Sequence, residues 1–142
     1  MGEYADYALA TTTFSARGPR SRRRPPTCPK CGERAKRSET RFGARYDCCG
    51  LWSWGRHPLV DARTHAMRLR AHQAFDRLWM SRLMRRGEAY AALAAELGIP
   101  KHECHMKLMT AEVAERVPRA VVAISLRARQ AAAAALTAPP MQ

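Results

Sequence analysis

Four of the five cysteines of this chain lie within 22 residues, and their spacing suits a metal ion. Cys28 and Cys31 form a Cys-x2-Cys pair, and Gly32 after them supplies the positive φ that such a turn usually needs. Cys48 and Cys49 follow 17 residues after Cys31, the distance at which a short hairpin returns to the same ion. The sequence therefore predicts a zinc ribbon with one Zn2+, and four protein ligands would make that zinc structural.

The second half of this site departs from the usual ribbon. It reads Cys48-Cys49-Gly50, which is two residues shorter than Cys-x2-Cys-Gly. Either both adjacent cysteines reach the ion through a strained turn, or only one of them does and His57 supplies the fourth ligand. We favour the set of four cysteines and keep His57 as the alternative ligand.

The charge of the chain favours an anionic partner. Lys and Arg number 25 against 12 Asp and Glu, a formal net charge of +13. Residues 17–47 carry eleven Lys and Arg against three acids, so +8, whereas residues 83–118 carry five of each. Nucleic acid is the simplest partner for such a field, DNA in preference to RNA. Arginine makes up 21 of the 25 cations, which suits phosphate and guanine, although a GC-rich genome gives the same bias.

Basic side chains in three segments are the predicted nucleic-acid contacts. The dense run at 17–24 is interpreted as an arm that lies along phosphates, with a solvated linker as the alternative. The predicted contacts are Arg17, Arg20, Arg22, Arg23 and Arg24 in the arm, Lys30, Lys36, Arg41 and Arg45 in the ribbon, and Lys101, His105 and Lys107 beyond it.

Alternation through residues 41–48 predicts a strand, with Phe42, Tyr46 and Cys48 on its apolar face. Trp52 and Trp54 share a face across Ser53. They could stack on bases, or they could cover the small core of the ribbon; we favour the cover.

The rest of the chain reads as helical. Helices are predicted over 62–86, 88–97, 101–109 and 111–117, with Asp61 capping the first and Gly87 ending it. Pro118 either kinks the last of these or begins a new helix over 119–136. The fold class is small α+β: an N-terminal zinc ribbon with a short β-hairpin, followed by a mostly α-helical bundle. The expected domains are a flexible basic arm (1–27), the ribbon (28–58), a helical domain (59–137) and a disordered tail (138–142).

Residues 88–109 also resemble a helix-turn-helix. Ala94 sits where the two helices would pass closely, and Gly98 occupies the turn. The second helix would then present Lys101, His102, His105 and Lys107 to DNA. Plain helix packing is the interpretation we favour, because the local net charge is zero.

The order of motifs resembles a family of zinc-finger-containing domains common in phage and prophage genomes. The resembling segments are Cys28-Pro-Lys-Cys31-Gly32, Tyr46-x-Cys48-Cys49-Gly50, His57-Pro58-Leu59, Arg70 to Trp79, Glu88 to Ile99 and Glu103-Cys-His105. The resemblance covers about residues 28–110. It implies one structural zinc and no known catalytic activity.

Two functions compete. The first is a small zinc-binding protein that binds nucleic acid in a non-catalytic, regulatory role. The second is a protein-interaction module that binds and modulates a host or phage enzyme. An enzyme is not expected, because no His-Glu-x-x-His, nucleophile elbow or phosphate loop appears, and no small-molecule substrate is expected either.

A cytoplasmic location is expected, within the host cell if a phage encodes the chain. No stretch approaches 18 apolar residues, so no membrane partner is predicted. Glu3 and Asp6 occupy the place where a signal peptide would be basic.

Overall fold

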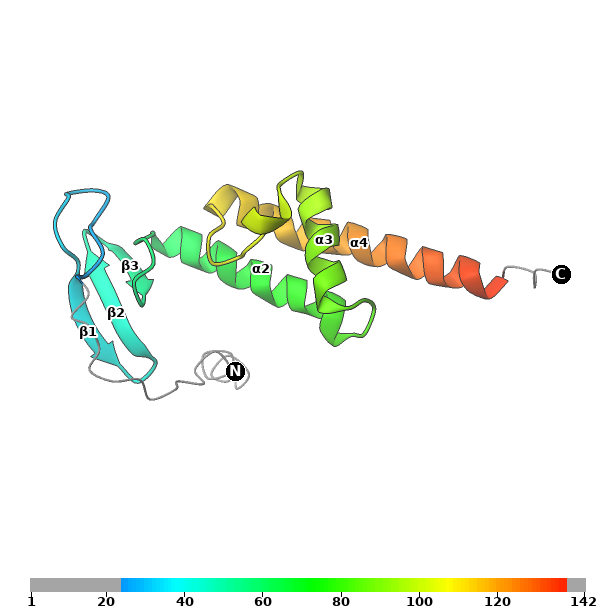
Figure 1. Ribbon diagram of the computed structural model, residues 1–142, viewed down its shortest axis with the longest axis horizontal. Helices are drawn as coiled ribbons and strands as arrows, with labels where there is room; N and C mark the ends of the chain where they lie inside the picture. The colour runs from blue at the N-terminus through cyan, green and yellow to red at the C-terminus, as the bar shows by residue number, and fades with distance from the viewer. Residues whose placement is uncertain (1–23, 138–142) are drawn as a thin grey trace. The chain divides into compact units, whose positions relative to one another are not determined.

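The computed structural model describes residues 24–137, which contain one three-stranded sheet and three α-helices (Figure 1). They divide into two compact units, one ending at Asp61 and the other beginning at Ala62, and each is described by itself. The tail predicted over 138–142 and four arginines of the predicted arm, Arg17, Arg20, Arg22 and Arg23, lie outside the described residues.

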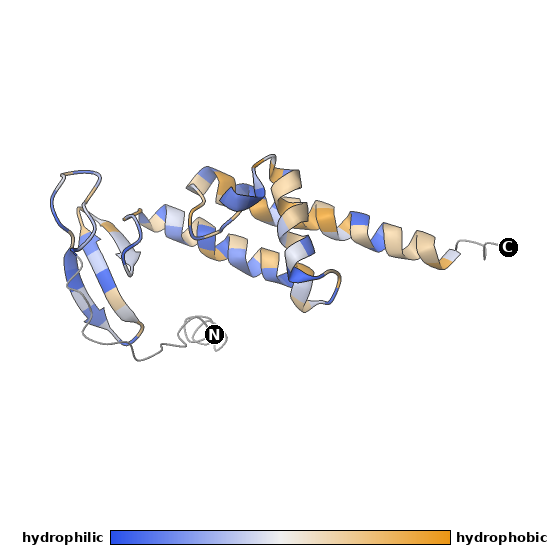
Figure 2. Ribbon diagram, in the orientation of Figure 1, coloured by the Kyte–Doolittle hydropathy of each residue, from blue (hydrophilic) through white to orange (hydrophobic). Residues whose placement is uncertain are grey.

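The first unit is built on an antiparallel sheet. Strands β1 (Lys36–Thr40), β2 (Gly43–Cys48) and β3 (Leu51–Trp54) follow one another in the order β1-β2-β3. The predicted strand is confirmed, and the expected hairpin gains a third strand. Figure 2 shows that β1 is hydrophilic along its length, in keeping with its exposed side chains.

One face of this sheet, here called the inner face, carries the core of the unit. The buried side chains are Cys28, Ala35, Tyr46, Leu51 and Leu59, with Ala44 and Cys48 packed against them. A core of this size is small even for a three-stranded sheet, which needs a hydrophobic face or a covering helix to be stable. The unit therefore depends on something besides apolar burial.

The tryptophans lie on the opposite face, here called the outer face. Arg45 pairs with Trp54 and Asp47 pairs with Trp52 in the register of β2 and β3. Directly paired residues point to the same side of a sheet, so the two charged and the two aromatic side chains share one face. The expectation that the tryptophans cover the ribbon core is wrong, because Leu51 and Ser53 point inward in their place.

The second unit contains α2 (Ala62–Met80), α3 (Arg86–Leu97) and α4 (Ala111–Thr137) around one core. Its largest fully buried side chains include Phe75, Leu78, Leu93 and Val117. Polar contacts tie α2 to α4 and to the segment before it: Arg63 pairs with two glutamates of α4, and Arg68 Nε donates to the Met109 carbonyl at 2.8 Å. None of the helices in the described range is long and apolar enough to cross a bilayer.

The first predicted helix is too long. It ends at Met80, Arg82 adopts a φ of 60°, and Gly87 lies inside α3. The physical reason is a cap: the Glu88 carboxylate accepts a hydrogen bond from the Arg85 backbone N–H at 2.9 Å. This bond satisfies a donor at the start of α3 and favours a new helix over the continuation of the old one.

The helix predicted over 101–109 is also wrong. After Gly98, whose φ of 70° ends α3, the chain forms only a 3-10 turn, η1 (Lys101–Glu103). Cys104, Met106 and Met109 are buried, and a spacing of two and then three residues does not lie on one helical face. The second helix expected of a helix-turn-helix is therefore missing from this segment.

α4 runs through Pro118 without a break. Thr110 caps it, since its Oγ1 accepts a bond from the Val113 N–H at 3.3 Å. A proline inside a helix costs about 3 kcal/mol. Burial of Val117, Ala120 and Val121 on either side of it opposes that cost.

Candidate metal centre and ribbon surface

The first half of the site is a tight turn that directs two thiols the same way. The Gly32 N–H donates to the Cys28 carbonyl at 2.9 Å, and the Cys28 N–H donates to the Glu33 carbonyl at 2.8 Å. Gly32 has a φ of 77°, which confirms the role expected of it. The turn holds Cys28 buried and Cys31 exposed.

The second half is a two-residue hairpin turn between β2 and β3. Cys48 pairs with Leu51, and the two residues between them have positive φ: 53° at Cys49 and 75° at Gly50. Positive φ at both central positions is the signature of a type I′ turn, which matches the twist of the strands on either side. The turn explains the missing spacer residues, since Cys48 ends a strand and Cys49 opens the turn.

These two turns bring four sulfur atoms together. The Sγ atoms of Cys28, Cys31, Cys48 and Cys49 all lie within 4.8 Å of one another. The Cys31–Cys48 distance is 3.5 Å and the Cys48–Cys49 distance is 3.7 Å. Four thiolates about 2.3 Å from a tetrahedral zinc stand about 3.8 Å apart, so the cluster fits one zinc ion. His57 is exposed and is not part of this cluster.

The short distances between the thiols shift their pKa values in opposite directions. Burial would raise the pKa of Cys28, but backbone N–H groups of Cys31 and Lys30 and neighbouring thiols lower it to about 7. The thiols of Cys31 and Cys28 raise the pKa of Cys48, and the Cys31 thiol raises that of Cys49. Four sulfurs this close cannot all be thiolates without a counter-charge, because the negative charges repel one another. A divalent cation at the centre of the cluster would stabilise all four thiolates.

A comparison with protein families matches residues 24–124 to DUF3268, described as a zinc-finger-containing domain. The chain belongs to this family. No curated protein and no solved structure matches the chain. The cysteine cluster and the family together show a zinc-binding domain with a single structural zinc.

In this zinc-finger-containing domain, the predicted ribbon contacts fall into two groups. Lys30 Nζ donates to the Cys49 carbonyl at 3.4 Å, so it links the two halves of the zinc site. Lys36 and Arg45 lie on the outer face, and Arg41 lies in the turn between β1 and β2. Arg45 is bound to Asp47 through Nε and Nη2, with the shortest distance 2.7 Å.

The sequence pattern did not identify Phe42 as an exposed aromatic residue of the ribbon surface. Alternation placed it beside Tyr46 on the apolar face, but Phe42 lies in the turn between β1 and β2 and is 51% exposed. There its ring meets Trp54 edge to face, at a centroid distance of 6.3 Å. The signal that could have found it is the short Arg41-Phe42 segment before Gly43, which marks a hairpin loop.

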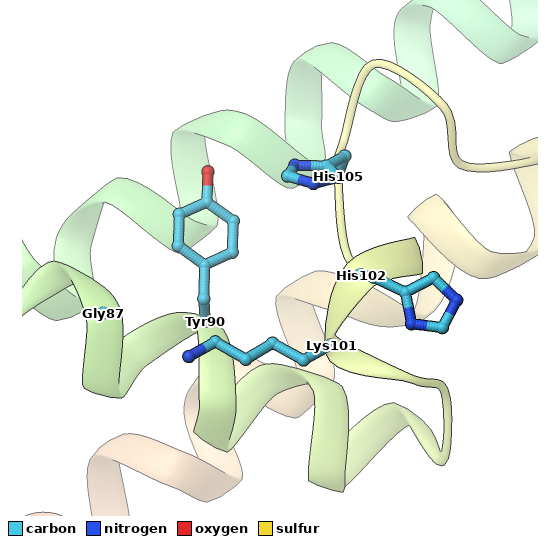
Figure 3. A pocket seen from close by; sticks show the side chains of 5 residues that line it. All are labelled: Gly87, Tyr90, Lys101, His102 and His105. Atoms are coloured by element: carbon cyan, nitrogen blue, oxygen red, sulfur yellow. The ribbon is translucent and has the colours of Figure 1, made fainter.

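The predicted contacts of the helical unit lie on η1 and the loop that follows. Lys101, His102 and His105 line an open hollow of about 530 Å³ together with Gly87 and Tyr90. Figure 3 shows the His105 ring beside the Tyr90 ring and the Lys101 side chain running past the base of Tyr90, with the His102 ring directed away. Lys107 is exposed nearby in sequence but does not line the hollow. Their contact with nucleic acid stays a prediction.

Proposed function

We propose that this zinc-binding domain binds nucleic acid in a non-catalytic, regulatory role, with the ribbon as its main contact. The supporting observation is the charge of the described ribbon. Residues 24–57 carry eight Lys and Arg against three acids, and two of these acids, Glu39 and Asp47, pair with Arg37 and Arg45.

Eight cations less these two arginines leave six without an acidic partner within ion-pair distance among residues 24–137. Two of the six, Lys30 and Arg34, donate to backbone carbonyls instead. The other four are Arg24, Lys36, Arg41 and Arg56. Lys36 stands opposite Asp47 in the register of β1 and β2, so it belongs to the outer face. Cations without an acidic partner, on the sheet and in the turns next to it, suit a line of phosphates, because each contact releases a condensed counterion.

Zinc has a structural part in this proposal. The inner face buries few side chains, so the sheet needs the ion to hold its two turns together. Binding to nucleic acid should therefore depend on zinc even though the ion touches no phosphate.

The test is binding of zinc-loaded protein to labelled single-stranded and duplex DNA and RNA at several salt concentrations. The double variant Lys36→Gln/Arg41→Gln should bind more weakly, and its slope of log affinity against log salt should fall by about one per lost contact. Arg119→Gln/Arg129→Gln is the matched control, since it removes two exposed arginines from α4. If the unmodified protein binds neither nucleic acid at low salt, the proposal is wrong.

A second function, a protein-interaction module, is supported by α4. Val122 and Leu126 are exposed and four residues apart, so they share one face of that helix. A partner protein that covers this face should be lost with Val122→Ser/Leu126→Ser, while nucleic-acid binding stays unchanged.

A further inference from the structure

The outer face of the sheet carries three aromatic side chains in mutual contact. Trp54 stands between the other two, edge to face with Trp52 at a centroid distance of 5.6 Å and with Phe42 at 6.3 Å. Trp54 is 38% exposed, and Phe42 is more exposed still. Packing of the ribbon core does not account for this cluster, because the core lies on the inner face.

Two arginines make cation–π contacts with the rings on either side of Trp54. The Arg45 guanidinium lies 4.4 Å from the centre of the Trp52 ring, and Asp47 fixes it there through two of its nitrogens. The Arg41 guanidinium lies 4.5 Å from the centre of the Phe42 ring. Cation–π contacts of this kind orient the rings before any ligand arrives, so less conformational entropy is lost on binding.

The surroundings of the rings are cationic. Lys36 extends from the same face and Arg41 flanks Phe42, whereas the one acid on this face, Asp47, is taken by Arg45. An apolar peptide would gain nothing from the surrounding cations, and an acidic peptide would pair with the cations but leave the aromatic rings without a partner. A chain of flat bases joined by phosphates complements both features.

We propose that Phe42 and Trp54 form a stacking platform for unpaired bases, so that the preferred ligand is single-stranded nucleic acid. This inference rests on the proposed function and specifies its ligand. Bases of a duplex are stacked on each other and cannot reach rings on a sheet face. The absence of a helix over 101–109 also removes the element expected to enter a major groove.

The test uses the full chain with zinc bound and an unstructured oligothymidylate, compared with a duplex of the same length. Single strands should bind more tightly than duplex. Trp54→Ala and Phe42→Ala should each weaken single-strand binding by about five- to a hundredfold, with an unchanged salt slope and little effect on duplex. Trp54→Phe keeps a ring and should stay close to wild type. Leu108→Ala removes an exposed apolar side chain of the helical unit and is the matched control.

The outcomes separate the two proposals. Nucleic-acid binding that is equal for single strands and duplex, and indifferent to both alanine variants, overturns the platform and leaves the proposed function standing. No binding to either nucleic acid overturns both. If Trp54→Ala loses its zinc, Phe42→Ala decides alone, because Phe42 lies in a turn outside the paired strands.

Discussion

Cys49 performs two tasks that a substitution can separate. As a ligand it supplies one of four thiolates, and as a turn residue it adopts a φ of 53°, which residues other than Gly, Asn and Asp rarely take. Asn-Gly is the favoured pair for a type I′ turn, so Cys49→Asn removes the thiol and improves the turn. Cys49→Ala removes the thiol and keeps the strain.

The magnitudes follow from the free energy that a structural zinc typically contributes and from the number of its ligands. A structural zinc contributes about 10–16 kcal/mol, so one of four equivalent thiolates contributes about 3 kcal/mol. Cys49→Ala should therefore weaken zinc binding about 100-fold. Asparagine relieves about 1 kcal/mol of left-handed strain, and because zinc binding and local folding are coupled, Cys49→Asn should lose only about 20-fold.

Competition with a chromophoric chelator at fixed pH measures both affinities. His57→Ala is the control, since His57 is outside the cluster, and its affinity should match that of the unmodified protein. Wild-type affinity in Cys49→Ala would show that Cys49 is no ligand. A loss in His57→Ala would replace the four-cysteine set by one that contains the histidine.

Three further outcomes are expected. Chelation should abolish the fixed environment of Trp52 and Trp54 in near-UV circular dichroism and leave the far-UV helical signal, because the helical unit has its own core. Gly98→Ala should lower the free energy of unfolding by about 1 kcal/mol, because φ is 70° at that position. Gly87→Ala lies inside α3 without positive φ and should raise the free energy of unfolding by roughly 0.5 kcal/mol. Thermal melts distinguish the two variants, and equal effects would contradict the turn geometry. Ser53→Ala should raise the free energy of unfolding by up to about 1 kcal/mol in denaturant titrations, because the buried Ser53 hydroxyl finds no partner among the described residues. A clear loss of stability would mean that the hydroxyl is hydrogen-bonded.

The zinc site was predictable because its information is local. Two short segments of defined spacing set it, and the structure brings together the four cysteines that the spacing indicated. The helix boundaries were less accessible. Apolar periodicity runs on through Met80 towards Gly87, and only the Glu88 side chain, bonded back to the Arg85 N–H, decides that a new helix begins. Periodicity describes which face is buried, whereas caps decide where a helix stops.

The outward position of the tryptophans follows from the length of one turn. With Cys49-Gly50 as a two-residue turn, Cys48 must face Leu51, Asp47 must face Trp52 and Arg45 must face Trp54. A register shifted by one residue would send both tryptophans inward and Leu51 outward, because side chains alternate along a strand. The same turn carries two of the four zinc ligands. An ion held by Cys48 and Cys49 therefore favours this register as well as the turn, and we expect the aromatic face to lose its order when zinc is removed.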